Sequence, residues 1–532
     1  MKRMRSRLVS ILLIVAMLTT MLPVQVFATE LEDEAPANIV TESDPIEALR
    51  VASQPDFSFT TVSGKVVDSQ GTGVSGVSVM LYNLDENTTL SQCVTDATGS
   101  WVSADYDAIV GYTYIISYYK TGYEITPNNI EVTALSGGTT VEAVTATPLD
   151  IGDLVCNAAD YSYTIDTEKA TITKYTGSDT ALLLPSELGG YPVVAIGSSA
   201  FEDNKTVQTV CLSDNITSIG SYAFENCSAL STIYFSNGLT TINSRAFYNC
   251  VGLTDLSLPN SLTTIGSQAF YGCIGFTNID LPDSITTINS NAFMNCSNLE
   301  SINYPASWSS AGSGIFSGCT KLTSMAVPEG VTSIPSSAFE NANCLKSISL
   351  PSTLKTIGSY AFENCKVLDT INFPGGLTTI NNRAFYNCVG LADLSLPNSL
   401  TTIGSYAFYG CTGFTNIDLP DNITTINGNA FQNCSNLEHI NYPASWNSAS
   451  SSIFYGCTKL TSMTVPEGVT AIPSYAFENA NCLKSVTLPS TLKTIGNSAF
   501  EDCKVLDTIN FPDGLTTINN WAFNGCVSLT EL

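Results

Sequence analysis

LTDLSLPNSLTTIGSQAFYGC, which runs from Leu253 to Cys273, is one copy of a motif that recurs every 23 residues. We number each copy from its Phe, so that Cys273 lies at +3 from Phe270. Ala precedes this Phe in all but two copies, and Cys follows it at +3 in twelve. Self-similarity at a short fixed period is typical of a repeat architecture. The fifteen phenylalanines in register are Phe201, Phe224, Phe247, Phe270, Phe293, Phe316, Phe339, Phe362, Phe385, Phe408, Phe431, Phe454, Phe477, Phe500 and Phe523.

Each unit has too few apolar side chains to close a hydrophobic core alone, whereas stacked units bury the same positions as continuous rows. The segment 256–259 (Leu-Ser-Leu-Pro) alternates and ends at Pro, so it predicts a strand of a long parallel sheet. Residues 263–266 predict a second short strand, and the Ser-x-Ala-Phe segment predicts a tight helical or 3₁₀ turn. At ~4.8 Å per stacked strand, the units predict a curved rod of roughly 70 Å.

The repeats also show a longer period: six units form a block of 138 residues, and the sequence of that block recurs. The stretch Cys250–Gly272 recurs as Cys388–Gly410, and only two positions differ, Thr254/Ala392 and Gln268/Tyr406. Block duplication lengthens a rod without creating a unique pocket. This pattern favours a binding or structural array over an enzyme.

The repeat closely resembles the BspA-type (Treponema-like) leucine-rich repeat. Residues 161–196 also resemble the usual lead-in of that family, with ATIT at 170–173 and GGYPV at 189–193. We therefore assign residues 150–195 to an N-terminal lead-in or cap and residues 196–532 to the repeats. The resemblance implies a secreted or surface-displayed bacterial protein that adheres to or binds extracellular macromolecules, and it implies no shared catalytic residues.

Residues 59–149 differ from the repeats and predict a small β-sandwich, because β-branched and aromatic runs alternate with turns. The sequence motif Gly64-Lys65-Val66-Val67-Asp68, with Thr95-Asp96 and Gly122-Tyr123 further along the chain, resembles the carboxypeptidase-regulatory-like domain, a non-catalytic spacer. A Cna-B-like sandwich is the neighbouring alternative, in which Lys65 would form a cross-strand isopeptide bond. The predicted fold class is thus mainly β, a leucine-rich-repeat solenoid preceded by a small sandwich.

Residues 1–28 have the pattern of a secretory signal peptide: a basic start, an apolar run from Leu8 to Leu22, and Val26-Phe27-Ala28 as cleavage site. The apolar run is shorter than the ~20 residues of a membrane span. Residues 29–58 form an acidic linker. The expected location is therefore secreted or extracellular, either free or attached to the cell surface, without membrane insertion after cleavage.

Charge and composition exclude several function classes. The chain holds 20 basic and 47 acidic residues, and four of the basic ones fall in the signal peptide, which leaves 16. This excess of acid argues against nucleic acid and anionic bilayers as partners. The chain has one histidine in 532 residues, which excludes most mechanisms that depend on histidine. It also has no Cys-x-x-Cys pair, the spacing that would indicate a metal site. We predict no enzymatic activity, no cofactor and no metal.

The 17 cysteines allow two interpretations. Export favours disulfides, since stacked neighbours fall near disulfide range. We favour a row of buried free thiols, because evenly spaced identical neighbours offer no preferred pairing.

Polar side chains at +8 and +10 alternate with the buried positions of the predicted sheet, so they should face outward. Their short amides and carboxylates suit hydrogen bonding to glycans, peptides or Ca²⁺, and an inert solvated face is the alternative. The candidate ligand-binding face consists of Asp255, Asn278, Asp280, Asn303, Asn372, Asp393, Asn416, Asp418, Asn441 and Asn510.

A second outward stripe carries aromatic residues at −2 and +1. Packing between adjacent turns explains most of them, and carbohydrate stacking is the alternative. The stripe comprises Tyr222, Tyr248, Tyr271, Tyr360, Tyr386, Tyr406, Tyr409, Tyr455, Tyr475 and Trp521.

These features predict an exported binding or adhesion protein that engages an extracellular protein or glycan through its solenoid. One alternative is a non-catalytic targeting arm of a larger, truncated secreted enzyme, because the sequence stops at Leu532 inside a unit. The other is a purely structural surface component.

Overall fold

The structure is a computed structural model that describes residues 59–530, apart from 84–87, 104–107, 111, 120–122, 127–128, 137, 149–153, 305–311, 393 and 443–449. The predicted signal peptide and acidic linker lie outside the described residues. The chain divides into two compact units, Met1–Asp150 and Ile151–Leu532. The described part of both units is built almost entirely from strands and turns. This confirms the predicted mainly β class.

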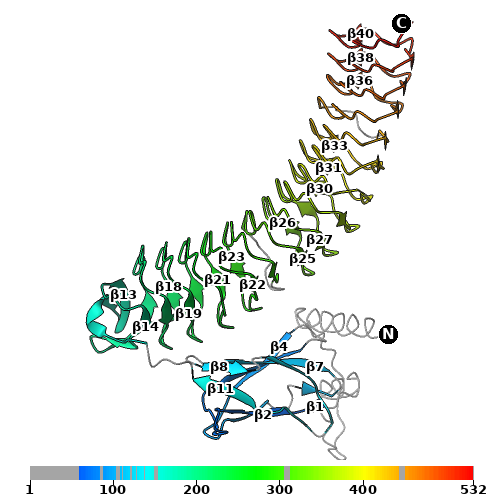
Figure 1. The fold of residues 1–532 in the computed structure, drawn as a ribbon. Coiled ribbons are helices and arrows are strands. Elements are labelled where there is room, and N and C mark those ends of the chain that lie inside the picture. The colour runs from blue at the N-terminus through cyan, green and yellow to red at the C-terminus, as the bar shows by residue number, and fades with distance from the viewer. Residues whose placement is uncertain are drawn as a thin grey trace, which may run out of the picture. The chain divides into compact units, whose positions relative to one another are not determined.

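The first unit is a sandwich of two sheets (Figure 1). A five-stranded sheet has the order β10 (Thr139–Thr140), β2 (Val62–Val67), β11 (Val144–Pro148), β8 (Tyr123–Thr126), with β5 (Ser100–Val102) also paired to β2. A four-stranded antiparallel sheet has the order β4 (Thr88–Val94), β3 (Ser78–Asn83), β7 (Thr113–Tyr119), β9 (Asn129–Thr133), and β1 (Phe59–Thr60) pairs with β6 (Ala108–Ile109). Both sheets contribute to one core, in which the rings of Trp101 and Tyr118 meet edge to face at 5.9 Å.

Lys65 lies exposed on β2 of this sandwich. The isopeptide alternative for this residue stays a prediction.

The second unit begins with a short 3₁₀ helix, η2 (Ala158–Asp160), and an antiparallel hairpin. The hairpin consists of β12 (Tyr161–Asp166) and β13 (Lys169–Tyr175), and β15 (Glu187–Leu188) and β16 (Tyr191–Ile196) follow. β13 pairs in parallel with β16, which pairs with the first repeat strand, so the hairpin starts the ladder. The ring of Tyr175 stacks on Phe201 at 5.3 Å and covers the first Phe of the repeats.

Most of the described repeat units contribute short strands to two parallel ladders, and the turns stack into a curved solenoid (Figure 1). The Thr-Ile ladder continues from β16 through β18 (Ser218–Ile219), β20 (Thr241–Ile242), β21 (Thr264–Ile265) and β23 (Thr287–Ile288). It resumes as β26 (Ser333–Ile334), β28 (Thr356–Ile357), β30 (Thr379–Ile380), β31 (Thr402–Ile403) and β33 (Thr425–Ile426), and again as β36 (Ala471–Ile472), β38 (Thr494–Ile495) and β40 (Thr517–Ile518).

The second ladder, which we call the polar sheet, is formed by the +8 to +10 positions in shorter runs. Its strands are β14 (Ala181–Leu183), β17 (Thr209–Cys211), β19 (Thr232–Tyr234); β22 (Asn278–Ile279), β24 (Ser301–Ile302); β25 (Ser324–Ala326), β27 (Ser347–Ser349), β29 (Thr370–Ile371); β32 (Asn416–Ile417), β34 (His439–Ile440); and β35 (Ser462–Thr464), β37 (Ser485–Thr487), β39 (Thr508–Asn510). Among the described residues, the long parallel sheet expected from the sequence is therefore divided into short segments. Some neighbouring turns pair there only through a single bridge, as at Ser257–Asp280.

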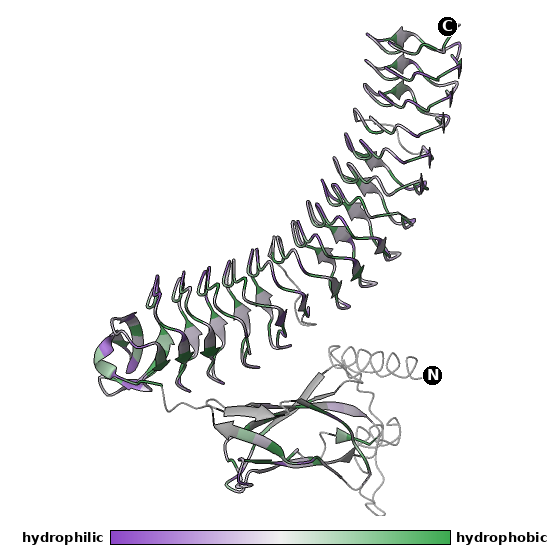
Figure 2. Ribbon diagram, in the orientation of Figure 1, coloured by the Kyte–Doolittle hydropathy of each residue, from purple (hydrophilic) through white to green (hydrophobic). Residues whose placement is uncertain are grey.

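The core is a row of stacked phenylalanines that runs through all fifteen units. Consecutive rings lie 4.7–6.1 Å apart, centroid to centroid. The two widest steps, 6.1 Å, are Phe293–Phe316 and Phe431–Phe454, which occupy equivalent places in the two blocks. Figure 2 shows hydrophobic stretches alternating with hydrophilic tips along the turns. The prediction of one shared interior is confirmed.

The segment around each Phe is a series of tight turns, in which bonds from N–H(i) to O=C(i−3) recur, as from Cys227 to Phe224 at 3.1 Å. It does not become a helix because the residues at −2 and +2 of every unit have positive φ. The +2 residue is always Asn, Asp or Gly, the residues that accept this left-handed conformation most easily. Their N–H groups point to the next unit, as when Asn226 donates to the carbonyl of Tyr248 at 2.7 Å.

Candidate binding faces of the solenoid

The polar sheet presents its +8 and +10 side chains to solvent, as predicted. Ile279 is buried, whereas its neighbours Asn278 and Asp280 are exposed, and the same alternation holds at Ile417 and Ile371. Nine of the ten candidate residues are exposed; Asp393 lies outside the described residues. The candidate residues fall into five pairs 138 residues apart: Asp255/Asp393, Asn278/Asn416, Asp280/Asp418, Asn303/Asn441 and Asn372/Asn510.

Strand pairing brings several of these residues side by side across adjacent turns. Asn278 faces Ser301, whose hydroxyl donates to the Asn278 Oδ1 at 2.6 Å. Asn416, the equivalent residue in the next block, faces His439, which is exposed. The residues of the two blocks therefore form two similar polar clusters, rather than one.

Four of the candidate residues already use their side-chain amides within the fold: Asn278 and Asn416 bond to neighbouring hydroxyl groups, and Asn303 and Asn441 bond to the backbone of the previous turn. Asn303 accepts a hydrogen bond from the Leu281 N–H at 2.6 Å and donates to the Leu281 carbonyl at 2.8 Å. Asn441 does the same with Leu419, at 2.6 and 2.8 Å. These two side-chain amides make the same pair of hydrogen bonds as a backbone peptide group would, and so they connect one turn to the previous one. Their first role is to hold the polar sheet together.

The carboxylates of Asp255, Asp280 and Asp418 have no hydrogen-bond or ion-pair partner within the described part of the chain. Desolvation by the surrounding turns raises the pKa of Asp280 above its ordinary value. No group of three or more His, Cys, Asp or Glu side chains suited to a metal ion occurs among the described residues. These carboxylates therefore have acceptor capacity that no described residue uses.

The second stripe, at −2 and +1, contains contacts that sequence reasoning missed. Tyr386 stacks on Tyr409 at 4.5 Å, and Tyr248 stacks on Tyr271 at 4.6 Å, so these aromatic rings of adjacent turns pack on each other, as expected from the sequence. Arginines occupy the same stripe at −2: Arg245 lies over Tyr248 at 5.0 Å, and Arg383 over Tyr386 at 5.1 Å. The pattern that could have revealed them is an Arg with tyrosines one repeat before and three residues after it.

The cysteine ladder holds free thiols, as we favoured from the sequence. All 17 cysteines are free, and thirteen of them are buried. Each of the twelve thiols at +3 donates to the carbonyl of the preceding unit's Phe at 3.0–3.3 Å, as Cys250 does to Phe224. Burial raises the pKa of Cys227 to about 12 and that of Cys273 well above its ordinary value. These thiols fill the core of the solenoid.

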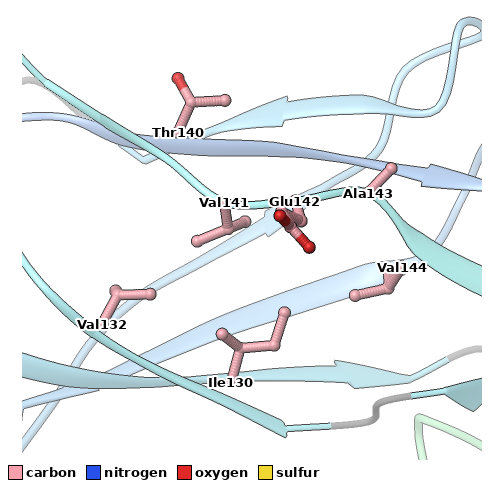
Figure 3. Close-up of a pocket in the computed structure, with 7 residues that line it drawn as sticks. All are labelled: Ile130, Val132, Thr140, Val141, Glu142, Ala143 and Val144. Atoms are coloured by element: carbon pink, nitrogen blue, oxygen red, sulfur yellow. The ribbon is translucent and has the colours of Figure 1, made fainter.

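A hollow of about 390 Å³ opens at one edge of the sandwich (Figure 3). Ile130 and Val132 of β9 line one side of it, and the segment 140–144 lines the other. Apart from Thr140 and the exposed Glu142, its lining is apolar. It opens beside the edge strands of the two sheets and lacks converging polar groups.

A family model for the BspA type leucine rich repeat region matches residues 190–274, 240–369, 332–461 and 447–532. These ranges together span more than half of the chain, so the chain belongs to the BspA-type leucine-rich-repeat family. The predicted resemblance is thus confirmed for the repeats. The match does not extend to residues 59–149, where the carboxypeptidase-regulatory-like resemblance stays a prediction.

Solved structures of bacterial leucine-rich-repeat proteins resemble the chain. A leucine-rich repeat protein from Bacteroides ovatus is 29% identical, with a TM-score of 0.56, over 70% of this chain and 92% of that chain. A leucine rich cell surface protein from Faecalibacterium prausnitzii is 26% identical over 70% of this chain and 97% of that one, with a TM-score of 0.40. The leucine-rich-repeat protein of T. pallidum is 29% identical over 40% and 89%, with a TM-score of 0.32. No curated protein matches the chain.

These findings define a solenoid of a generally non-catalytic family, in which binding, above all of proteins, is the usual role. Within the part of the chain that the structure describes, no helix has the length and apolarity to cross a bilayer.

Proposed function

We propose that the protein is an exported bacterial binding or adhesion protein whose polar sheet engages an extracellular protein or glycan. The observation that carries this proposal is the row of exposed side chains at +8 and +10, which contains carboxylates without partners among the described residues. A solenoid commonly uses such an extended face for recognition.

The two similar polar clusters support multivalent contact. They are separated by six turns, so both can touch one extended ligand or two copies of a repeated ligand. When two weak sites act together, the second contact becomes intramolecular and the apparent affinity rises by orders of magnitude. An adhesion protein gains from this arrangement because its ligands are polymers or densely displayed glycoproteins.

Binding is tested with the full chain on an array of fibronectin, fibrinogen, laminin and purified glycans. We expect a saturable hit that weakens at least tenfold in the triple variant Asp255→Ala, Asp280→Ala, Asp418→Ala, because each loses a charged acceptor. The matched control removes the same charge from three exposed residues of the lead-in, Asp166, Glu168 and Glu187. Equal binding by the two triple variants would exclude the polar sheet as the binding face.

Export is tested separately in a bacterial host that secretes the protein. We expect cleavage after Ala28, so that the secreted chain begins at Thr29. Intact-mass measurement of the medium and cell fractions checks this. A full-length chain retained in cells would contradict it.

A further inference from the structure

The described part of the chain contains two arginines, Arg245 and Arg383, and both lie at −2 in equivalent units of the two blocks. Each is only partly buried and lies against tyrosines of its own and neighbouring turns. Neither arginine forms an ion pair within the described residues, as is true of most of the described lysines. This raises the question of what their donors bind.

Around Arg383 the rings form a cage, which we call the tyrosine cage. The guanidinium carbon lies 5.6 Å from the ring centroid of Tyr360, 5.1 Å from Tyr386 and 5.3 Å from Tyr406. Tyr386 stacks in turn on Tyr409, whose hydroxyl accepts from Asn433 at 2.9 Å. The rings thus hold the guanidinium in place by cation–π contact.

The first block contains a less complete version of this cage. Arg245 lies 5.7 Å from Tyr222 and 5.0 Å from Tyr248, but Gln268 stands where the second block has Tyr406. Arg245 Nε donates to the Gln268 Oε1 at 2.7 Å. A third, partial block follows the second, and in it Ser498 and Trp521 occupy the places of Tyr360 and Arg383, so the chain supplies its own comparison.

The tyrosine cage positions donors that the fold leaves unused. The guanidinium of Arg383 makes no hydrogen bond to any other described residue, although it carries five N–H donors in a planar fork. Tyr360 is 38% exposed, so its ring also reaches solvent. Packing between turns explains the stacked rings, but it does not explain a fixed set of unpaired donors beside an exposed aromatic ring.

We propose that the tyrosine cage is a subsite for one sugar residue of a neutral glycan. The apolar C–H face of a pyranose would lie on Tyr360, and its hydroxyl oxygens would accept hydrogen bonds from the Arg383 fork. A neutral sugar fits better than an acidic polymer because the chain as a whole is strongly acidic and Glu363 lies near Arg383. The Arg245 site is a weaker copy, since one of its donors is already bound by Gln268.

The subsite lies on the −2/+1 stripe, apart from the polar sheet, and adds a second contact surface to the proposed function. The two proposals can therefore fail independently. The triple variant of the polar sheet should leave sugar binding at the cage unchanged.

The test is affinity electrophoresis of the full chain in native gels that contain xylan, mannan, galactan, barley β-glucan or dextran. We expect at least one polysaccharide to retard the chain. The variants Arg383→Ala and Tyr360→Ala should each weaken that retardation about tenfold, because the first loses hydrogen bonds from a charged donor and the second loses the ring on which the sugar stacks. Gln268→Tyr, which completes the first cage, should strengthen it. Position 268 already has positive φ with Gln, as position 406 has with Tyr, so this change adds little backbone strain.

Three controls keep folding and recognition apart. Ser498→Ala, at the third-block position equivalent to Tyr360, should bind like the unaltered chain. Arg383→Lys keeps the charge but loses the planar fork, so it should stay folded by thermal melting and still lose retardation. The proposal is overturned if no neutral polysaccharide retards the chain, or if Arg383→Lys binds as well as the unaltered chain.

Discussion

At the scale of single residues, stacking places many side chains next to their own counterparts in the adjacent units. Glu340 and Glu363 occupy the same +1 position in consecutive turns, and Glu363 Oε2 is buried without a hydrogen-bond partner among the described residues. Desolvation, with the charge of Glu340 second, raises the pKa of Glu363. The equivalent residue one block later behaves differently: hydrogen bonds from Ser498 and Asn524 lower the pKa of Glu501.

These opposite shifts predict opposite effects of one substitution. Because the pKa of Glu363 is raised, its charged form costs stability as the pH rises through that pKa, so Glu363→Gln should stabilise the fold at about pH 7. We expect Glu363→Gln to raise the free energy of unfolding by roughly 0.5 kcal/mol. This is at the low end of the effect of facing like charges because the Glu340–Glu363 pair is partly solvated. Glu501, with a lowered pKa, contributes stability above its ordinary pKa, so Glu501→Gln should destabilise at about pH 7.

Urea unfolding of both variants at about pH 7 and about pH 3.5, below the ordinary glutamate pKa, checks this prediction. Both effects should shrink at the lower pH, where the carboxyls become protonated. A gain from Glu363→Gln that persists unchanged at low pH would show that charge is not its cause.

The buried thiols make a second residue-scale prediction. Iodoacetamide should label the exposed Cys156, Cys344 and Cys482 in the native chain, and Cys93 more slowly because it is half-buried. The thirteen buried cysteines should react only after unfolding, since a thiol with a raised pKa holds almost no reactive thiolate. Peptide mass spectrometry after pulsed labelling counts the modified sites. Disulfide-linked peptides from neighbouring units would contradict the free-thiol ladder.

At the scale of the repeat element, the left-handed residues at +2 decide whether the turn after each Phe can form. Asn364 has φ of 61°, and its side chain donates to Asn341 at 2.9 Å and accepts from Asn387 at 3.3 Å. Five other units carry Gly at this position, among them Gly272 and Gly410. The turn therefore requires a residue that tolerates positive φ. The hydrogen bonds between Asn side chains of adjacent units add stability but are not required for the turn to form.

This argument predicts a difference between two substitutions at one site. Asn364→Gly loses the side-chain hydrogen bonds, whereas Asn364→Ala loses them and also strains the backbone. Alanine should therefore be less stable than glycine by about 1 kcal/mol. Denaturant midpoints of the two variants give the difference directly. Equal stabilities would mean that the left-handed backbone at this turn is not a constraint.

At the scale of the whole solenoid, each turn contacts only its neighbours, so damage at the centre and at the end should differ. Phe362 is fully buried between Phe339 at 5.4 Å and Phe385 at 5.1 Å, whereas Phe523 is partly exposed and stacks only on Phe500, at 5.2 Å, within the Phe row. A nearest-neighbour array loses cooperativity where one interface is weakened.

We expect Phe362→Ala to cost about 3–5 kcal/mol and to let the two sides of the solenoid open separately. Phe523→Ala should cost less and affect only the last units. Hydrogen exchange measured by mass spectrometry distinguishes these outcomes, since it reports protection turn by turn. Uniform loss of protection along the solenoid in both variants would contradict nearest-neighbour stability.

The sequence by itself determined the repeat, its core and its outward positions. A period of 23 residues forces equal positions to stack, so Phe270, Cys273 and Ile279 could be assigned to the interior, and Asp280 to the surface, without coordinates. Strand alternation then fixes which side chains face solvent. These conclusions depend only on local spacing, which a sequence displays directly.

Only the tertiary structure decided which outward groups are free. Asn303 and Asp280 look equivalent in the sequence, yet the Asn303 amide is bound to the Leu281 backbone and the Asp280 carboxylate is not. The cage around Arg383, the breaks in the polar sheet and the left-handed residues at −2 were likewise invisible. The reason is physical: each depends on how side chains and peptide groups of adjacent turns meet in space, and the spacing along one turn does not specify that contact.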